Sequence, residues 1–74
     1  MIDTFNKTLG ARFREMRLEA GLSQKTFAHA FDVSTPTISR LESGDRRLTV
    51  QELGILADTF GFDIAALLKQ EVAS

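Results

Sequence analysis

The sequence contains no cysteine, one proline and no long apolar run. Without cysteine the chain can form neither disulfide bonds nor thiolate metal sites, which fits a reducing cytoplasm. No apolar run approaches the ~18 residues that a membrane span needs. The first residues also lack the basic segment and apolar core of a signal peptide. These absences predict a cytoplasmic protein with no membrane segment and no bound metal or other cofactor.

The sequence also lacks the marks of a catalytic site. A chain of 74 residues forms one domain, here expected over residues 1–74, and leaves little area for a separate cleft. It has no nucleophile beside a base, no phosphate-binding glycine loop and no paired carboxylates at a suitable spacing. His29 is the only histidine, and we expect it on an exposed helix face. We therefore do not expect an enzyme.

Charge is small in total but uneven along the chain. The net charge is −1. Residues 1–47 carry eight basic and six acidic groups, a balance of +2, and residues 48–74 carry one basic and four acidic groups, a balance of −3. The N-terminal two-thirds is thus mildly basic, which by itself distinguishes poorly between a nucleic-acid surface and ordinary surface charge.

Helical spacing occurs five times, and no segment alternates like a strand. We expect an all-α fold with helices over about 3–20, 24–31, 35–43, 50–60 and 64–68. Ser23, Ser34 and Asp63 are good N-caps, and Thr49 with Glu52 forms a capping-box pattern. The expected core consists of Leu9, Phe13, Phe27, Ile38, Leu53, Leu56 and Phe60. Ala20 and Val50 are expected to face inward too, and Gly54 could let another helix approach closely.

The segment 23–44 has the pattern of a helix-turn-helix. The break D-V-S separates its two expected helices by three residues, and helices joined by so short a turn cross at a steep angle. On the second helix of this pair, Ile38 and Leu41 face inward. The outward face carries Thr35, Pro36, Ser39, Arg40 and Ser43. Short side chains let a helix enter the major groove, and an arginine can bond a guanine or a phosphate. A purely solvated face would more often carry Glu, Lys and Gln.

These residues resemble the lambda-repressor and Cro type of helix-turn-helix, also called the xenobiotic-response-element family. The resemblance covers about Leu9 to Leu68. It rests on Gly21-Leu22-Ser23-Gln24, Phe27-Ala28, Val33-Ser34, Ile38-Ser39, Leu41-Glu42-x-Gly44 and the downstream L-T-V-Q-E-L-G-I-L-A-D-T-F-G-F-D-I-A-A-L-L. It implies a compact five-helix domain of bacterial or phage origin. The implied function is sequence-specific binding of double-stranded DNA, as a transcriptional repressor on a palindromic operator.

The resemblance also implies roles for particular residues. Thr35, Pro36 and Arg40 would read bases in the major groove. Further DNA contacts would come from Gln24, Ser34, Thr37, Ser39, Ser43, Arg46 and Arg47. Arg17 and Glu42 would form a structural ion pair between the first and third helices. Asp32 departs from the glycine usual at the turn, but Asp tolerates the left-handed backbone that this position needs.

Useful specificity requires two domains on one operator, because one short helix reads few base pairs. We expect a homodimer that pairs through Ile55, which should fall opposite the Leu53–Leu56 stripe, and through Phe62 and Val72. Two other functions stay open. The chain could be a protein-interaction module such as an antitoxin, or the DNA-binding domain of a longer regulator. The short segment after Leu68 favours a regulator over an antitoxin.

Overall fold

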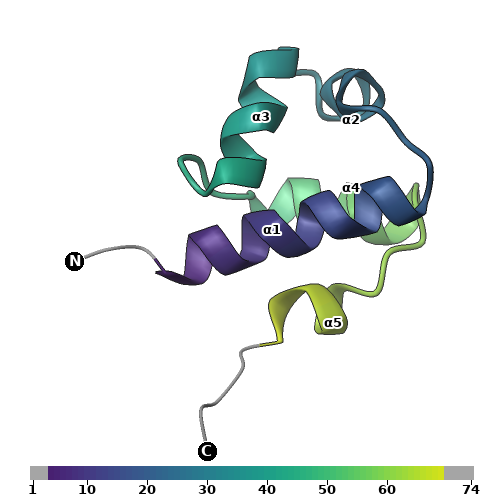
Figure 1. Ribbon diagram of the computed structural model, residues 1–74. Helices are drawn as coiled ribbons and strands as arrows, with labels where there is room; N and C mark the ends of the chain where they lie inside the picture. Colours follow the sequence, from purple (N-terminus) through teal and green to yellow (C-terminus); the bar gives the residue numbers. More distant parts are fainter. Residues whose placement is uncertain (1–3, 70–74) are drawn as a thin grey trace, which may run out of the picture.

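The computed structural model describes the backbone of residues 4–69 and the side chains of residues 7–69. Within this part the chain forms five α-helices and no strand, as the sequence predicts (Figure 1). They are α1 (Thr4–Glu19), α2 (Gln24–Phe31), α3 (Thr35–Ser43), α4 (Val50–Asp58) and α5 (Ile64–Leu68). The fourth helix ends two residues before the expected Phe60.

The helices begin where the sequence places their caps. Ser23 accepts a hydrogen bond from the backbone N–H of Thr26, and Ser34 accepts one from that of Thr37. Each bond satisfies one of the N–H groups left without a partner in a first helical turn. At α4 both halves of the capping box between Thr49 and Glu52 are present. These local bonds fix the start of each helix independently of the core.

The turn between α2 and α3 passes through Asp32 in the left-handed conformation, with φ 58° and ψ 47°. Asp32 is the one non-glycine residue of the described backbone with positive φ. The N–H of Asp32 donates to the carbonyl of His29, and the N–H of Val33 donates to the carbonyl of Ala28. The expected turn is therefore kept with aspartate in place of glycine, since Asp occupies this region more readily than most residues.

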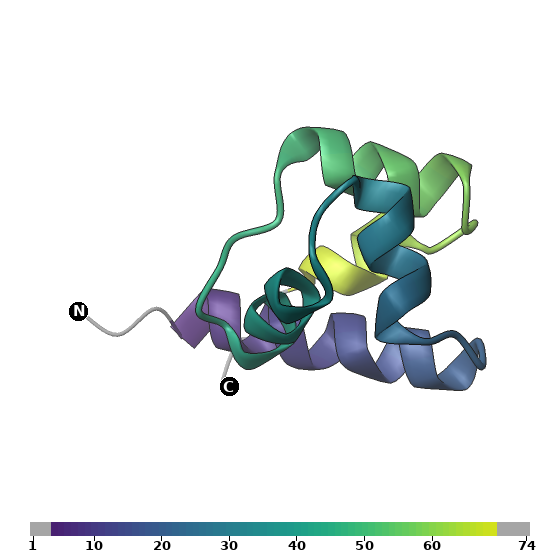
Figure 2. The same cartoon turned by 90° about the horizontal axis from the view of Figure 1, so that it is seen from above.

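The helices pack in layers around α1. In Figure 1, α2 and α3 lie above α1, α4 lies behind it and α5 lies below it. In Figure 2, which is seen from above, α1 and α4 lie on opposite sides of the view. Both α1 and α2 pack against α3, while α5 packs against α1 and α4. The far side of α3, away from these neighbours, is left on the surface.

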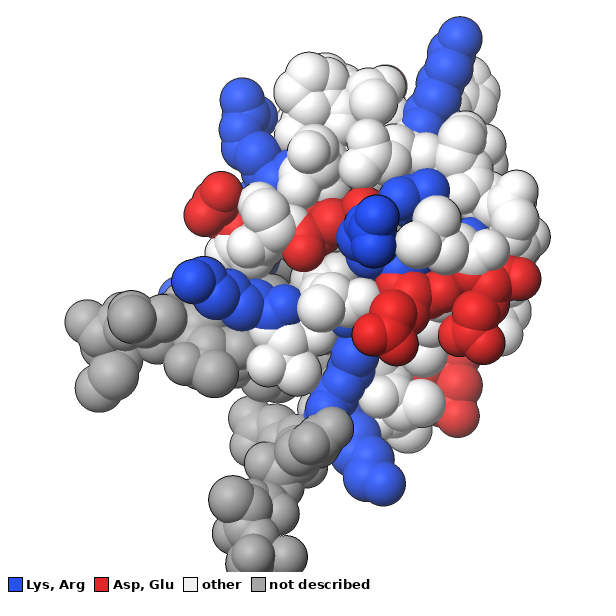
Figure 3. Space-filling view, viewed as in Figure 1, with Lys and Arg blue, Asp and Glu red and all other residues white. Residues whose placement is uncertain are grey.

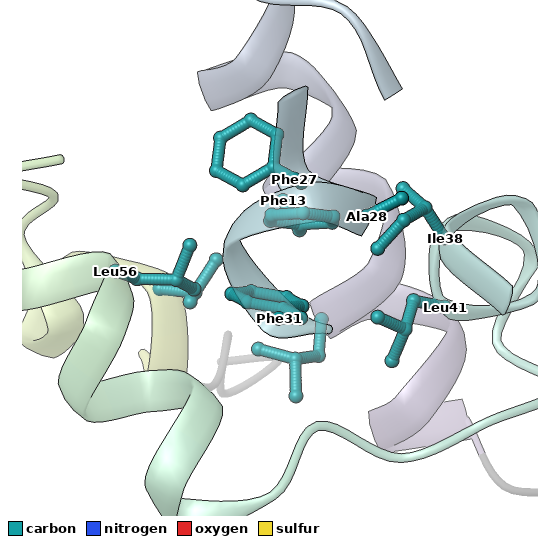
Figure 4. Packing of buried hydrophobic residues seen from close by; sticks show 9 residues of the cluster. Phe13, Phe27, Ala28, Phe31, Ile38, Leu41 and Leu56 are labelled. Carbon is teal, nitrogen blue, oxygen red and sulfur yellow. The ribbon is translucent and has the colours of Figure 1, made fainter. Parts of the chain in front are cut away.

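The core is built largely of phenylalanine rings and branched aliphatic side chains (Figure 4). Phe27 is fully buried, and its ring centre lies 5.0 Å from that of Phe13 and 4.3 Å from that of Phe60. Five of the seven expected core residues are buried, and Leu53 and Phe60 are half-buried against them. The buried apolar set is Leu9, Phe13, Phe27, Ala28, Phe31, Ile38, Leu41, Leu56 and Leu67.

The helices α1 and α3 approach each other closely at Gly10, which no local sequence pattern singles out. A Cβ atom on Gly10 would lie 2.2 Å from the carbonyl oxygen of Leu41 and 2.8 Å from that of Glu42. Real Cβ atoms do not come this close to backbone atoms, so α1 and α3 can pack at this distance only with glycine here. Gly10 therefore helps to set the position of α3.

Three expectations about packing are wrong. A Cβ atom placed on Gly54 would have no other atom within 4 Å, so no helix approaches there. Val50 is 86 % exposed, because it lies in the first turn of α4, before the turns that place Leu53 and Leu56 against the core. Ala20, expected on the inner face of the first helix, is exposed because α1 ends at Glu19.

The two helix glycines give a matched test of this packing. Gly10→Ala should lower the free energy of unfolding by about 1–3 kcal/mol, because overpacking forces α1 and α3 apart. Gly54→Ala should raise it by about 0.5–1 kcal/mol, since it adds helix propensity without a clash. Thermal unfolding followed by circular dichroism measures both. A more stable Gly10→Ala protein would show that the two helices can separate without cost.

Candidate nucleic-acid interface

The outward face of α3 carries four side chains that have no hydrogen-bond or ion-pair partner among residues 7–69. Inward, Ile38 and Leu41 are buried. Outward, Thr35, Pro36, Ser39 and Arg40 are exposed, and no side-chain hydrogen bond or ion pair occupies them within residues 7–69. Their spacing of one, three and one residues places them on one side of the helix. The face therefore combines short side chains with one long guanidinium.

The surface around the start of α3 is uncharged and bordered by positive charge. Figure 3 shows white atoms over the N-terminal end of α3 and the preceding turn, with blue side chains standing on either side. On the same face, red and blue atoms lie side by side over the C-terminal half of α1, which carries Glu15 and Glu19 but also Arg14 and Arg17. The tip of α3 therefore differs from the rest of this face, where charges of both signs lie together (Figure 3).

Three of the hydroxyls expected to touch DNA are engaged in the protein. Ser34 Oγ lies 2.9 Å from Thr37 Oγ1 and also caps α3, so these two hydroxyls share hydrogen-bonding capacity. Ser43 Oγ donates toward the carbonyl of Arg40 and toward Asp45 Oδ2, both at 3.1 Å. Phosphate oxygens only accept hydrogen bonds, so Ser43 would have to release these acceptors to reach one.

Arg17 and Glu42 form the ion pair that the resemblance implies. Arg17 Nε lies 2.6 Å from Glu42 Oε2, and Arg17 Nη2 lies 3.1 Å from Glu42 Oε1. The two side chains are 10 % and 4 % exposed. Arg17 Nη1 also donates to the carbonyl of Leu22 at 2.9 Å. The pair thus joins α1, the segment before α2, and the inner side of α3.

Gln24 is tied into the same network. Its Nε2 donates to Glu42 Oε1 at 3.0 Å, which holds the side chain across the first turn of α2 and beside α3. The resemblance implies a DNA contact for Gln24 and gives no sign of this bond. Because one N–H of the amide points at Glu42, its other N–H and its carbonyl oxygen remain for a ligand.

The two adjacent arginines of the α3–α4 loop differ in their surroundings. Arg46 is half-buried, and its Nη1 and Nη2 each lie 3.0 Å from a carboxylate oxygen of Glu52. The sequence indicates Glu52 only as part of the capping box. Arg47 is exposed. Local sequence gives no sign of this difference, because both residues lie in a loop without periodicity.

The residues expected at a dimer interface are less available than predicted. Ile55 is half-buried and packs against the core, so it does not point away from the Leu53–Leu56 side. Phe62 joins the aromatic cluster, with its ring centre 5.8 Å from that of Phe27 and 6.0 Å from that of Phe60. Val72 lies outside the described residues.

Other kinds of site are not apparent in the described chain. No group of three histidine or acidic residues within it could hold a metal ion. None of its helices is both long enough and apolar enough to cross a membrane. His29 is exposed on α2, as expected.

This geometry defines the class of protein. Two short helices meet at a tight turn, and the second presents its outer face while α1 packs against its inner side. That is the architecture of helix-turn-helix DNA-binding domains. In agreement, the fold is similar to the crystal structure of the DNA-binding domain of BldD, with a TM-score of 0.74 and 34 % sequence identity. The likeness covers 93 % of this chain and 100 % of that one.

The sequence comparisons place the chain more narrowly. A helix-turn-helix family model matches residues 13–67, and the chain belongs to this family, of the Cro/C1 type. Similar proteins include the propionyl-CoA carboxylase regulator of Cereibacter sphaeroides, at 36 % identity over 84 % of this chain. The transcriptional regulators PrpR of Mycobacterium tuberculosis and DdrOP3 of Deinococcus deserti are 41 % and 40 % identical over 77 % and 78 % of this chain.

The chain spans only a fraction of these relatives. It covers 13 % of the propionyl-CoA carboxylase regulator, 12 % of PrpR and 45 % of DdrOP3. The similarity therefore concerns their helix-turn-helix segment.

The ion pair beneath α3 can be tested against a neighbouring arginine. Arg17→Ala should lower the free energy of unfolding by about 3–5 kcal/mol, because it leaves the buried Glu42 carboxylate without its main partner. Arg14 also lies near Glu42, at 3.9 Å, but its side chain is 58 % exposed. Arg14→Ala should therefore cost no more than about 1 kcal/mol. Urea unfolding measures both, and equal losses would contradict the structural role of Arg17.

Proposed function

We propose that this domain binds double-stranded DNA in a sequence-specific way and regulates transcription, with α3 lying in the major groove. The main observation behind this proposal is the composition of the outward face of α3. It offers Thr35, Pro36 and Ser39, which are short, next to Arg40, whose guanidinium has no partner in the described protein. Short side chains allow the helix backbone to approach the base edges, where Arg40 can donate two hydrogen bonds to a guanine.

The charge of the domain supports the same orientation. The net charge is only −1, so overall attraction to DNA is weak and the local distribution decides the approach. The uncharged tip of α3 is flanked by positive side chains, whereas charges of both signs lie over the C-terminal half of α1 (Figure 3). This arrangement favours one way of approach, in which α3 meets the groove and the flanking cations meet the phosphates.

Gln24 has a supporting role in this complex. Glu42 holds its amide at the first turn of α2, beside the start of the surface that α3 presents. From there its second N–H can donate to a phosphate oxygen of the strand next to the groove. We assign base reading to Thr35, Pro36 and Arg40, and phosphate contacts to Gln24, Ser39 and Arg47. The hydroxyls of Ser34, Thr37 and Ser43 stabilise the ends of α3 through hydrogen bonds within the protein. Each can contact DNA only with the hydrogen-bonding capacity that those bonds do not use.

Two domains are needed for a useful operator, so we propose a homodimer on a palindromic site. Helix-turn-helix dimers place their recognition helices about 34 Å apart, one turn of DNA. The surface involved must leave α3 free. Because Ile55 and Phe62 already contribute to the core, they can supply only their exposed edges to such a contact.

The assignment of Arg40 is tested with operators selected from a random-sequence DNA library. Arg40→Ala should relax base preference at one position, with a loss of about 1–3 kcal/mol on the selected sequence relative to its point variants. Lys69→Ala removes a like charge from the end of α5, below α1, and should leave the preference unchanged. Equal losses on selected and random DNA would make Arg40 a phosphate contact.

The dimer is tested by footprinting on the same operators. Two protected stretches should appear one helical turn apart, related by two-fold symmetry, with binding that is cooperative in protein concentration. A single protected stretch with non-cooperative binding would contradict the dimer while leaving DNA recognition by α3 intact.

A further inference from the structure

The loop between α3 and α4 is closed by three residues that share one carboxylate, and we call this set the loop clamp: Arg46, Thr49 and Glu52. Glu52 Oε1 accepts from Arg46 Nη1 and from the backbone N–H of Thr49, both at 3.0 Å. Glu52 Oε2 accepts from Arg46 Nη2 at 3.0 Å. The side chain of Arg46 thus reaches over its own loop to the first turn of α4.

The burial of the clamp shows which way the guanidinium faces. The Glu52 side chain is 7 % exposed and that of Arg46 is 29 % exposed. A carboxylate this buried requires a charged or hydrogen-bonding partner, and Arg46 is its one ion-pair partner within the described chain. The edge of Arg46 formed by Nη1 and Nη2, which can hold a carboxylate or phosphate through two bonds, is therefore turned into the protein.

We propose that Arg46 is a positioning residue for DNA binding, acting through Glu52 and Thr49, and that it does not itself bond a phosphate. This inference rests on the proposed function. For Arg46 to hold a phosphate through Nη1 and Nη2, it would have to leave Glu52, and the buried carboxylate would keep only the N–H of Thr49. Leaving a buried charge without its counter-ion is strongly unfavourable, so the clamp stays closed when DNA binds.

The role of the clamp is to fix the path of residues 45–49 between the recognition helix and α4. One end of this loop is held at α3, where the N–H of Asp45 bonds to the carbonyl of Arg40 at 2.9 Å. The other end is held by the clamp. The exposed Arg47 lies between the two, so the direction in which it leaves the loop depends on both attachments.

The proposal predicts an unusual sign for a charge substitution. Glu52→Gln removes a negative charge next to the proposed DNA surface, and it retains an oxygen that can accept from Thr49, as glutamine does in capping boxes. If Arg46 bonded phosphate, this substitution would strengthen DNA binding, because it frees a cation and removes a repulsive charge. If Arg46 positions the loop, the substitution weakens binding.

The test measures the affinity of four proteins for a mixed-sequence DNA duplex over a series of salt concentrations. The proteins are the wild type, Arg46→Gln, Glu52→Gln and, as the matched control in the same loop, Arg47→Gln. If the opened loop holds the binding geometry only about a tenth of the time, affinity falls about tenfold in Arg46→Gln and in Glu52→Gln. The slope of log affinity against log salt should stay at the wild-type value in Arg46→Gln, since no phosphate contact is lost. In Arg47→Gln the slope, which is negative, should become less steep by about 0.9.

Two results would overturn the proposal. One is a salt slope in Arg46→Gln that is less steep than in the wild type by about 0.9, which marks a lost phosphate contact. The other is tighter binding by Glu52→Gln. The double variant Arg46→Gln/Glu52→Gln should bind no more weakly than the weaker single variant, because either change opens the clamp. Additive losses would count against the shared mechanism.

A measurement without DNA separates failure of the clamp from failure of the proposed function. Hydrogen exchange of the Thr49 amide should be faster in Arg46→Gln than in the wild type, because Glu52 then lacks the ion pair that holds its carboxylate at this N–H. Unchanged exchange would contradict the clamp itself. If exchange accelerates but the wild type binds no duplex at any salt concentration, the proposed function fails, and the DNA-positioning role fails with it.

Discussion

The arrangement of this domain depends on how α3 is held against α1. α3 has nine residues, and helices this short are not stable alone in water, so its direction is set by tertiary contacts. Two contacts fix it. The absence of a side chain at Gly10 lets the backbones meet, and the ion pair between Arg17 and Glu42 holds them from within. The first contact sets the distance between the helices, and the second is directional, since both nitrogen–oxygen pairs must align.

This support determines which residues of α3 can act on a ligand. Glu42 is held inward by Arg17 and Gln24, so the only acidic side chain of α3 is kept away from its outer face. Without that network a carboxylate would stand close to the phosphates and oppose binding. The same principle operates at the loop, where Glu52 is neutralised internally by Arg46. In both places a buried glutamate organises the backbone while its charge is hidden from the surface.

Much of the fold could be predicted from sequence because its signals are local. The caps at Ser23, Ser34 and Thr49 depend on residues three positions apart, and the structure confirms each. The partnership of Arg17 with Glu42 spans 25 residues and follows from a family resemblance, not from spacing. Resemblance also supplies the residues assigned to DNA, and those assignments remain predictions.

The misses share a physical cause, which is that they depend on which surfaces meet. Gly10 and Gly54 both lie inside helices, and only the crossing of α1 with α3 decides that the first is essential and the second is not. Val50 continues the apolar pattern of α4 but lies in its first turn, away from the core. The difference between Arg46 and Arg47 depends on the position of Glu52, which no local pattern reveals.

The central claim is that the outer face of α3 meets DNA, and backbone amide shifts in a DNA titration test it most directly. With a mixed-sequence duplex at low salt, the largest changes should fall on residues 34–43 and 45–49 and on Gln24. The C-terminal half of α1, including Leu18 and Glu19, should change little, because it lies away from the outer face of α3 (Figure 1). Largest changes over α5 or the end of α1, with α3 unaffected, would contradict the account.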